Sequence, residues 1–212
     1  MIQLYAITDS SAPPLPDVGS LRTIASGELA AVCAPATEAA VTPELLWRHE
    51  QVVEALMDDR DVLPVRYGTR VPDETSVARI LEQEYERLAE RLEFVRGAAE
   101  VSVRAFAADC GSIEPAAGQQ PMTGGDYLRG RARELASERE AARAIHEPLT
   151  ALARAVRQTQ TGFPHEVLRA AYLLDDADVA AFGELVVKLQ AANPTLQLVC
   201  TGPWPPYSFA ER

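Results

Sequence analysis

The sequence predicts an α+β protein with two subdomains, each built on an antiparallel sheet. From Glu100 to Cys200 the predicted elements run strand, helix, strand, strand, helix, strand, which is the ferredoxin-like split βαβ order. The first half reads strand, loop, hairpin, helix, strand, a modified or truncated version of that order in which a Pro-rich loop replaces the first helix. A long charged helix over residues 74–96 separates the two patterns.

These patterns predict three segments with boundaries at residues 97 and 201. Residues 1–97 form an N-terminal α+β domain that includes the connecting helix 74–96. Residues 98–201 form a C-terminal ferredoxin-like domain, and residues 202–212 form a Pro/aromatic tail that packs on the domains.

Apolar runs and turn residues indicate the N-terminal elements. Ile2 to Thr8 is a predicted strand, and a Pro/Ser-rich loop follows it. Two short apolar runs flank Ser26-Gly27-Glu28, which is the pattern of a β-hairpin. Thr42-Pro43-Glu44 predicts a helix start, with Thr42 as the N-cap and Pro43 at the first helical position. The apolar stripe of this helix continues to about residue 58.

The stretch Asp61 to Thr69 lies between the two predicted helices of the first half. Apolar and other residues alternate from Leu63 to Tyr67, which predicts a half-buried strand. Pro64 has no N–H to donate, so we expect the strand at an edge of its sheet. Gly68 then permits the turn that ends the strand.

The second half alternates strands with two helices. The predicted strands are Glu100–Phe106, Val156–Thr161, Glu166–Leu174 and Leu196–Cys200. The composition of residues 108–123, which are rich in Ala, Gly, Gln and Pro, predicts a mobile loop there. In the long helix after this loop we expect Pro148 to cause a kink or a split.

Composition excludes several classes of partner. The chain of 212 residues has 31 acidic and 20 basic residues and a formal net charge of −11. This charge argues against nucleic acid as a partner and against adsorption to anionic membranes. The three cysteines are not closely spaced, as expected of free thiols in a reducing compartment. We see neither a signal peptide nor an apolar run near the ~20 residues of a membrane span, so we expect a cytoplasmic protein.

No pattern of catalytic or metal-ligating residues emerges. His49, His146 and His165 lie far apart, and none has a Cys or an acidic residue at ligand spacing. No nucleotide fingerprint and no local nucleophile signature is present. We therefore expect no catalytic residues, no cofactor and no metal, and packed or solvated histidines are favoured over a metal site that assembles only in space.

Arg66 and the C-terminal tail are the candidates for structural or binding roles. Arg66 is the one cation in an apolar strand, and we prefer a structural ion pair to catalysis. In the tail, Pro203, Pro205 and Pro206 favour polyproline geometry without a regular ladder. Its aromatic residues are Trp204, Tyr207 and Phe209. We favour their packing on the chain's own domains over a free partner-binding tail.

Several of these segments carry a resemblance to a known family. They are Leu4-Tyr5-Ala6-Ile7, Val62-Leu63-Pro64-Val65-Arg66-Tyr67-Gly68-Thr69, Thr123-Gly124-Gly125-Asp126-Tyr127-Leu128 and Gly202-Pro203-Trp204-Pro205-Pro206-Tyr207-Ser208-Phe209. In this order, nearly end to end, they resemble the gas vesicle protein GvpL/GvpF family. Tyr67 stands where many relatives carry Phe, a mild change. The resemblance does not distinguish the F from the L paralogue.

The resemblance implies a non-enzymatic accessory protein of gas vesicles, which are gas-filled protein shells that give buoyancy. Such a protein is needed for assembly, binds the hydrophobic GvpA-type shell protein or other accessory proteins, and ends as a minor component of the vesicle. The alternative is an enzyme or a small-ligand-binding protein, because ferredoxin-like folds host many activities. A pocket with clustered carboxylates would favour the alternative, and an extended apolar groove would favour the assembly role.

Overall fold

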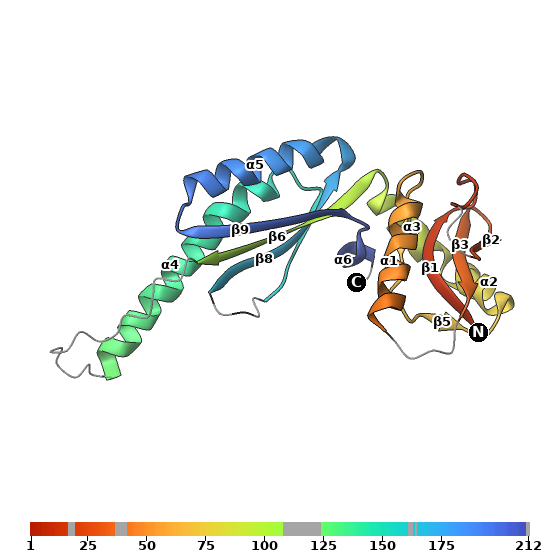
Figure 1. The fold of residues 1–212 in the computed structure, drawn as a ribbon, viewed down its shortest axis with the longest axis horizontal. Helices are drawn as coiled ribbons and strands as arrows, with labels where there is room; N and C mark the ends of the chain where they lie inside the picture. The colour runs from red at the N-terminus through yellow and green to blue at the C-terminus, as the bar shows by residue number, and fades with distance from the viewer. Residues whose placement is uncertain (17–19, 37–41, 108–123, 161–162, 164, 211–212) are drawn as a thin grey trace. The chain divides into compact units, whose positions relative to one another are not determined.

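The computed structural model describes residues 1–16, 20–36, 42–107, 124–160, 163 and 165–210 (Figure 1). The chain divides into two compact units. The first unit comprises Met1–Glu100 and Pro203–Arg212, and the second comprises Val101–Gly202. The chain passes to the second unit within strand β6 (Ala98–Ala107) and returns within strand β9 (Leu196–Trp204). The C-terminal segment therefore belongs to the same unit as the N-terminus.

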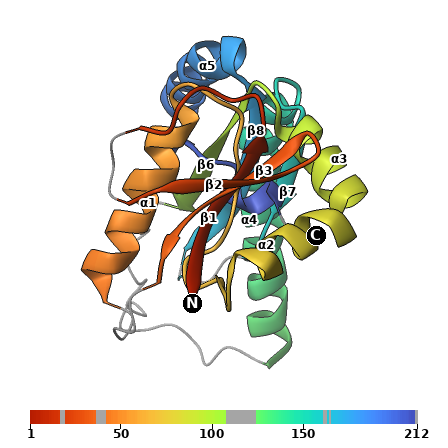
Figure 2. The same cartoon turned by 90° about the vertical axis from the view of Figure 1, so that its right-hand side faces the viewer.

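The first unit is built on a sheet with β1 (Ile2–Asp9) at its centre. The strand order is β2-β3-β1-β4, and β5 also pairs with β1. The other strands are β2 (Arg22–Ser26), β3 (Leu29–Pro35), β4 (Leu63–Pro64) and β5 (Arg70–Val71), and the pairs are antiparallel. Helix α1 (Pro43–Met57) covers one face, whereas α2 (Glu74–Gln83) and α3 (Tyr85–Val95) cover the other (Figure 2). Because both faces are covered, β1 and β3 are buried along most of their length.

Two local predictions in this unit are confirmed. Ser26 pairs with Leu29, so β2 and β3 form a hairpin with a two-residue turn. Gly27 has a φ of +61°, which favours glycine, and a Cβ there would make a tight 3.2 Å contact with the Tyr85 ring. Helix α1 begins as expected: the Thr42 hydroxyl accepts a hydrogen bond from the Leu45 amide at 3.3 Å, and Pro43 follows the cap.

The predicted strand Leu63–Tyr67 is shorter than expected. Only Leu63 and Pro64 form β4, and Val62, Leu63 and Pro64 are buried in succession instead of alternating. The Thr69 amide and hydroxyl both donate to the Arg66 carbonyl oxygen, at 3.2 and 2.9 Å. This turn begins before Tyr67 and includes Gly68, whose φ is +89°. The edge position is confirmed, because β4 pairs with β1 alone.

The long helix predicted over residues 74–96 is divided in two. The backbone of Glu84 leaves the helical region, with φ −107° and ψ 14°, and separates α2 from α3. A straight helix of this length would extend about 35 Å, beyond the roughly 27 Å of an eight-residue strand. The break allows Val77 and Leu81 of α2 and Leu92 and Val95 of α3 all to be buried.

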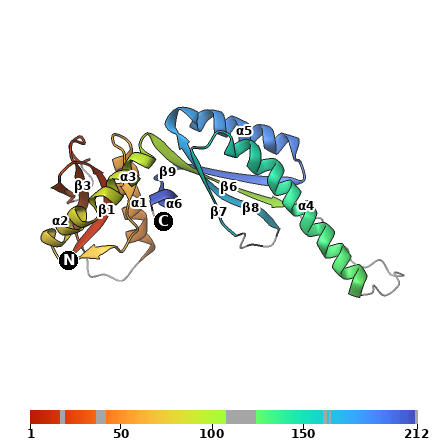
Figure 3. The same cartoon turned by 180° about the vertical axis from the view of Figure 1, so that it is seen from behind.

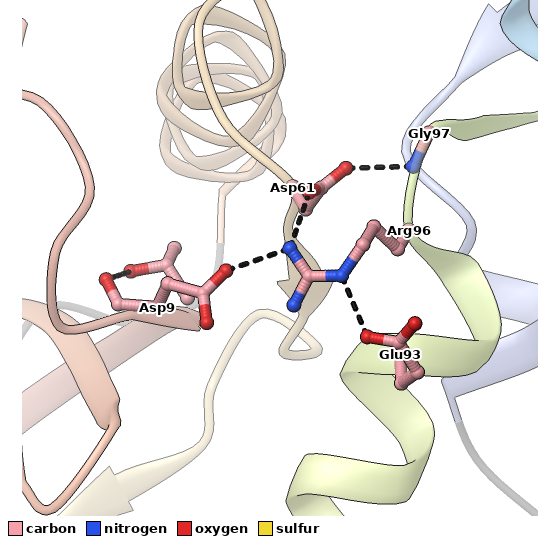
Figure 4. A network of polar contacts seen from close by, with 6 residues as sticks. Asp9, Asp61, Glu93, Arg96 and Gly97 are labelled. Carbon is pink, nitrogen blue, oxygen red and sulfur yellow. Dashed lines mark hydrogen bonds and ion pairs between the residues drawn. The ribbon is translucent and has the colours of Figure 1, made fainter.

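Arg96 joins three segments of the first unit at the end of α3 (Figure 4). Its guanidinium donates to Asp9 at 2.9 Å, to Asp61 at 3.0 Å and to Glu93 at 2.7 Å. The other oxygen of Asp61 accepts from the Gly97 amide at 2.7 Å. The network fixes the end of β1 and the segment after α1 against the start of β6. It also raises the pKa of Arg96 above its ordinary value, chiefly through the hydrogen bond to Asp9.

The second unit has the ferredoxin-like order that the sequence predicts. Its elements are β6, α4 (Gly124–Thr150), β7 (Ala155–Gln158), β8 (Glu166–Asp175), the short 3-10 turn Asp176–Asp178, α5 (Val179–Ala192) and β9. The strand order is β7-β8-β6-β9, and α4 and α5 lie on one face of the sheet (Figure 3). Tyr172, Phe182, Ile145 and Leu149 are among the fully buried residues of the core between them.

Two predictions in this unit need correction. The predicted split of the helix at Pro148 is wrong: α4 continues to Thr150, because the proline lies in its last turn. The alternative, a kink at Pro148, stays a prediction. Strand β9 runs on to Trp204, past the predicted end at Cys200, because an edge strand tolerates Pro203. The predicted mobile loop at 108–123 lies outside the described residues. Among the residues described, no helix is long and apolar enough to cross a membrane.

Candidate functional site

The C-terminal segment is partly regular structure, which corrects the expected polyproline strap without a ladder. Trp204 ends β9, Pro205 and Pro206 are buried, and α6 (Tyr207–Ala210) forms one helical turn. Phe209 is 2% exposed, whereas Trp204 is 44% exposed. Helix α6 lies against α3 and β4. Of the three aromatic residues singled out in the sequence, Phe209 is thus a core residue of the first unit and Trp204 a surface residue.

A buried carboxylate holds α6 in place. Glu100 accepts hydrogen bonds from the Ser208 amide at 2.8 Å and from the Ser208 hydroxyl at 2.6 Å. The Arg91 guanidinium donates to the Phe209 carbonyl oxygen at 3.0 Å. Glu100 is 7% exposed, and these bonds reduce the cost of burying its charge. Sequence analysis missed both anchoring residues; the available signal was an acidic residue inside an apolar strand.

Tyr207 faces helix α1. Its hydroxyl lies near the carboxylates of Glu50 and Glu54, and burial together with these charges raises its pKa above the ordinary value. Burial likewise raises the pKa of Glu50. The hydroxyl is buried, so Tyr207 brings a polar group to the junction of α6 and α1, where the acidic side chains of α1 are its neighbours.

Tyr67 belongs to an aromatic cluster around His49. The Tyr5 and His49 rings stack with centroids 4.8 Å apart, and Tyr67 meets His49 edge-on at 5.5 Å. His49 is 1% exposed, and its Nε2 lies 2.8 Å from the Val65 carbonyl oxygen, so this nitrogen carries the proton and donates it. Burial lowers the pKa of His49 below its ordinary value. The cluster connects α1 with β1 and with the turn after β4.

Acidification should destabilise the first unit through His49. Because its folded pKa is depressed, the unfolded chain binds the proton more readily, and stability falls as pH drops below the unfolded value of about 6.5. Above that pH the contribution is fully present. Denaturant unfolding at pH 7.5 and 5.5 should show that the free energy of unfolding falls less between these pH values in His49→Phe than in the natural chain. An equal loss in both would show that His49 is not responsible.

Arg66 lies on the turn beside this cluster and is exposed. The cost of removing one partner from a fully buried ion pair therefore does not apply to it. Its backbone carbonyl, which accepts twice from Thr69, closes the turn. A role of the side chain in stability or in partner binding stays a prediction.

Helix α1 exposes two adjacent apolar side chains. Leu46 is 45% exposed and Trp47 is 66% exposed, near the N-terminus of the helix. At 100° per residue, Trp47 lies opposite the buried face formed by His49, Val52, Val53 and Leu56, whereas Leu46 lies at the edge of that face. Tryptophan is enriched among the residues that dominate binding energy at protein interfaces, so the exposed Trp47 is a candidate contact for a partner.

The other histidines lie in the second unit. His146 Nδ1 is 2.7 Å from the Tyr172 hydroxyl, which is a packing contact beside the core. Within the part of the chain that the structure describes, no group of three or more His, Cys, Asp or Glu is arranged to hold a metal ion. Cys33 is buried and Cys200 exposed, and both are free thiols.

Comparison with known families identifies the chain. The family model described as "Gas vesicle synthesis protein GvpL/GvpF" matches residues 2–211. The chain belongs to the GvpL/GvpF family. It therefore has a role in gas vesicles, as the resemblance of its motifs indicated.

Members of the GvpL/GvpF family from bacteria and archaea are similar to this chain. Gas vesicle protein L of Streptomyces sp. (strain CB03234) is 37% identical over 76% of the chain and 67% of its own length. Gas vesicle protein F of the same strain is 29% identical over 98% of both proteins. Gas vesicle protein L1 of Halobacterium salinarum is 27% identical over 76% of the chain and 68% of its own length.

Crystal structures of two GvpF proteins have the same fold. GvpF from Anabaena sp. PCC7120 superimposes with a TM-score of 0.84 at 21% identity, covering 100% of this chain and 96% of that one. GvpF from Microcystis aeruginosa gives a TM-score of 0.78 at 18% identity, covering 100% and 99%. The fold similarity to these two GvpF structures therefore extends over both units of this chain.

Proposed function

We propose that this chain is a non-enzymatic accessory protein that is needed for gas vesicle assembly. It binds the hydrophobic GvpA-type shell protein, other accessory proteins, or both. It is cytoplasmic before assembly and becomes a minor component of the vesicle. Membership of the GvpL/GvpF family supports the vesicle role, and the exposed pair Leu46 and Trp47 supports the binding of an apolar partner.

The physical reason for such a protein lies in the shell subunit. A subunit with a large apolar surface aggregates unless that surface is covered before it joins the wall. An acidic chain with a net charge of −11 stays soluble while it presents an apolar contact. Tryptophan is enriched among residues that dominate binding energy, so Trp47 is the best single candidate on α1. Release needs no nucleotide if polymerisation of the shell removes the partner.

Co-expression of the affinity-tagged chain with the shell protein tests the proposal. We expect the shell protein to be captured, and the double variant Leu46→Ser, Trp47→Ser to bind it about 30-fold more weakly, since loss of a binding hot spot costs ~2 kcal/mol or more. Val187→Ser is the matched control, because Val187 is 69% exposed on α5 of the second unit.

The outcomes separate the binding face from the function itself. If the double variant captures the shell protein as well as the natural chain does, and Val187→Ser captures less, the binding face lies on the second unit. If neither the shell protein nor any other gas vesicle protein is captured, the proposed role in binding is wrong.

A further inference from the structure

A pocket of about 220 Å³ lies within the first unit, between β1, β5 and helix α1. Tyr5, Arg48, Tyr67 and Arg70 line it together with the apolar Leu45 and Val52. This volume corresponds to roughly seven water molecules. The pocket combines two cations and two phenols with an apolar wall, which is the composition of a site for a small ligand with a polar end.

The two arginines of the pocket have no anionic partner among the described residues. Among the residues that the structure describes, neither Arg48 nor Arg70 makes an ion pair or a side-chain hydrogen bond, and the Arg70 Nε is buried without a partner. Elsewhere in the chain Arg96 and Arg104 pair with carboxylates. A buried guanidinium N–H without an acceptor is costly, so it indicates a missing acceptor.

The surrounding structure holds these groups in fixed positions. Arg70 belongs to β5 and is paired with Gln3 of β1, while Arg48 projects from α1. The stacked His49 ring fixes Tyr5, whose hydroxyl lies near Arg48 and Tyr67. Donors from three elements thus converge on one pocket before any ligand arrives, which reduces the entropy lost on binding.

We propose that this pocket binds a small organic anion, with a carboxylate or phosphate group held by Arg48 and Arg70 and an apolar body against Leu45 and Val52. Guanidinium groups bind both kinds of anion through paired, charge-assisted hydrogen bonds. The tyrosine hydroxyls supply further donors. This activity is independent of the capture of a shell subunit and adds a ligand-binding role to the first unit.

Three probes that share one aromatic ring test the proposal on the purified full chain: benzoate, phenyl phosphate and the neutral benzamide. Binding is measured by NMR titration. We expect at least one of the two anions to bind at least ~10-fold more tightly than benzamide, as loss of one charge-assisted bond implies. The tighter of the two identifies the native group as carboxylate or phosphate. Equal binding of all three probes, or no binding of either anion at millimolar concentration, overturns the proposal.

Arg70→Met provides a second, independent measurement. It should weaken anion binding at least ~10-fold and at the same time raise the melting temperature of the ligand-free chain, because it removes an unpaired, partly buried cation. Arg87→Met is the control with the same change of charge, since Arg87 pairs with Glu84 on the surface outside the pocket. The assignment is contradicted if Arg70→Met binds the anions as tightly as the natural chain does. It is also contradicted if Arg70→Met melts at a lower temperature than the natural chain, as expected when a structural ion pair is lost.

Discussion

Replacing Phe209 with alanine should lower the free energy of unfolding of the first unit by about 3–5 kcal/mol, the range for deleting a buried phenylalanine ring. The side chain is 2% exposed, and α6 is anchored on either side of it, by Ser208 to Glu100 and by the Phe209 carbonyl to Arg91. The ring is therefore enclosed by a segment that cannot easily collapse into the space it leaves. A loss of this size is a large share of the 5–15 kcal/mol that stabilises a typical domain.

The two tryptophans make this measurement specific for the first unit. Trp47 and Trp204 are the only tryptophans in the chain, and both belong to that unit. Urea unfolding followed by their fluorescence therefore reports on it without a contribution from the second unit. Trp204→Ala is the matched control: its side chain is 44% exposed, so it should cost far less, and Trp47 remains as the reporter. A midpoint for Phe209→Ala equal to that of the natural chain would show that the C-terminal segment is not docked.

Deleting residues 202–212 extends the same argument to function. The deletion removes Phe209 together with the two hydrogen bonds that Ser208 donates to the buried Glu100 carboxylate. Vesicle formation in a host that lacks the natural chain should then be lost. If the deletion abolishes vesicles while Phe209→Ala destabilises the unit and leaves them intact, the segment has a binding role beyond packing.

The elements of the second unit could be predicted because each carries a local signal. The alternation in β6 and β8, the apolar stripe of α5 and the order of the elements are readable within short windows. The order alone then leaves few topologies, and the observed strand order β7-β8-β6-β9 is the ferredoxin-like one. The cap at Thr42 and the hairpin at Gly27 were predictable for the same reason.

The sites could not be predicted because their members are distant in sequence. Glu100 and Ser208 are 108 positions apart, and Arg96 reaches Asp9 across 87. No local pattern indicates that Arg48 and Arg70 share a pocket, because Arg48 lies on α1 and Arg70 on β5, two separate elements. The predicted ends of two strands were wrong for a related reason. Where a strand ends, at the turn after Arg66 or beyond Pro203 in β9, depends on which neighbouring strand it pairs with.

Replacing Glu166 with glutamine should destabilise the second unit by about 3 kcal/mol. The Glu166 carboxylate is fully buried and accepts from Arg104 at 2.6 Å, from two nitrogens of Arg169 at 3.0 and 2.8 Å, and from the Phe163 amide at 3.3 Å. Both guanidinium groups also lie over the Phe163 ring, at 5.0 Å (Arg104) and 5.4 Å (Arg169) from its centroid. Glutamine removes the charge that holds these groups together and leaves two arginines side by side.

The magnitude follows from the burial of each partner. Removing one member of a buried pair costs about 3–5 kcal/mol, and the low end applies because the arginine side chains are 35% and 33% exposed, so water offsets part of the loss. Glu147→Gln is the control: it removes the same charge from an exposed pair with Arg143 on α4 and should cost much less, because water screens an exposed pair. Native-state hydrogen exchange of the β6 and β8 amides measures both variants within the second unit. If the two variants lose the same small amount, the buried carboxylate adds no more than a surface ion pair.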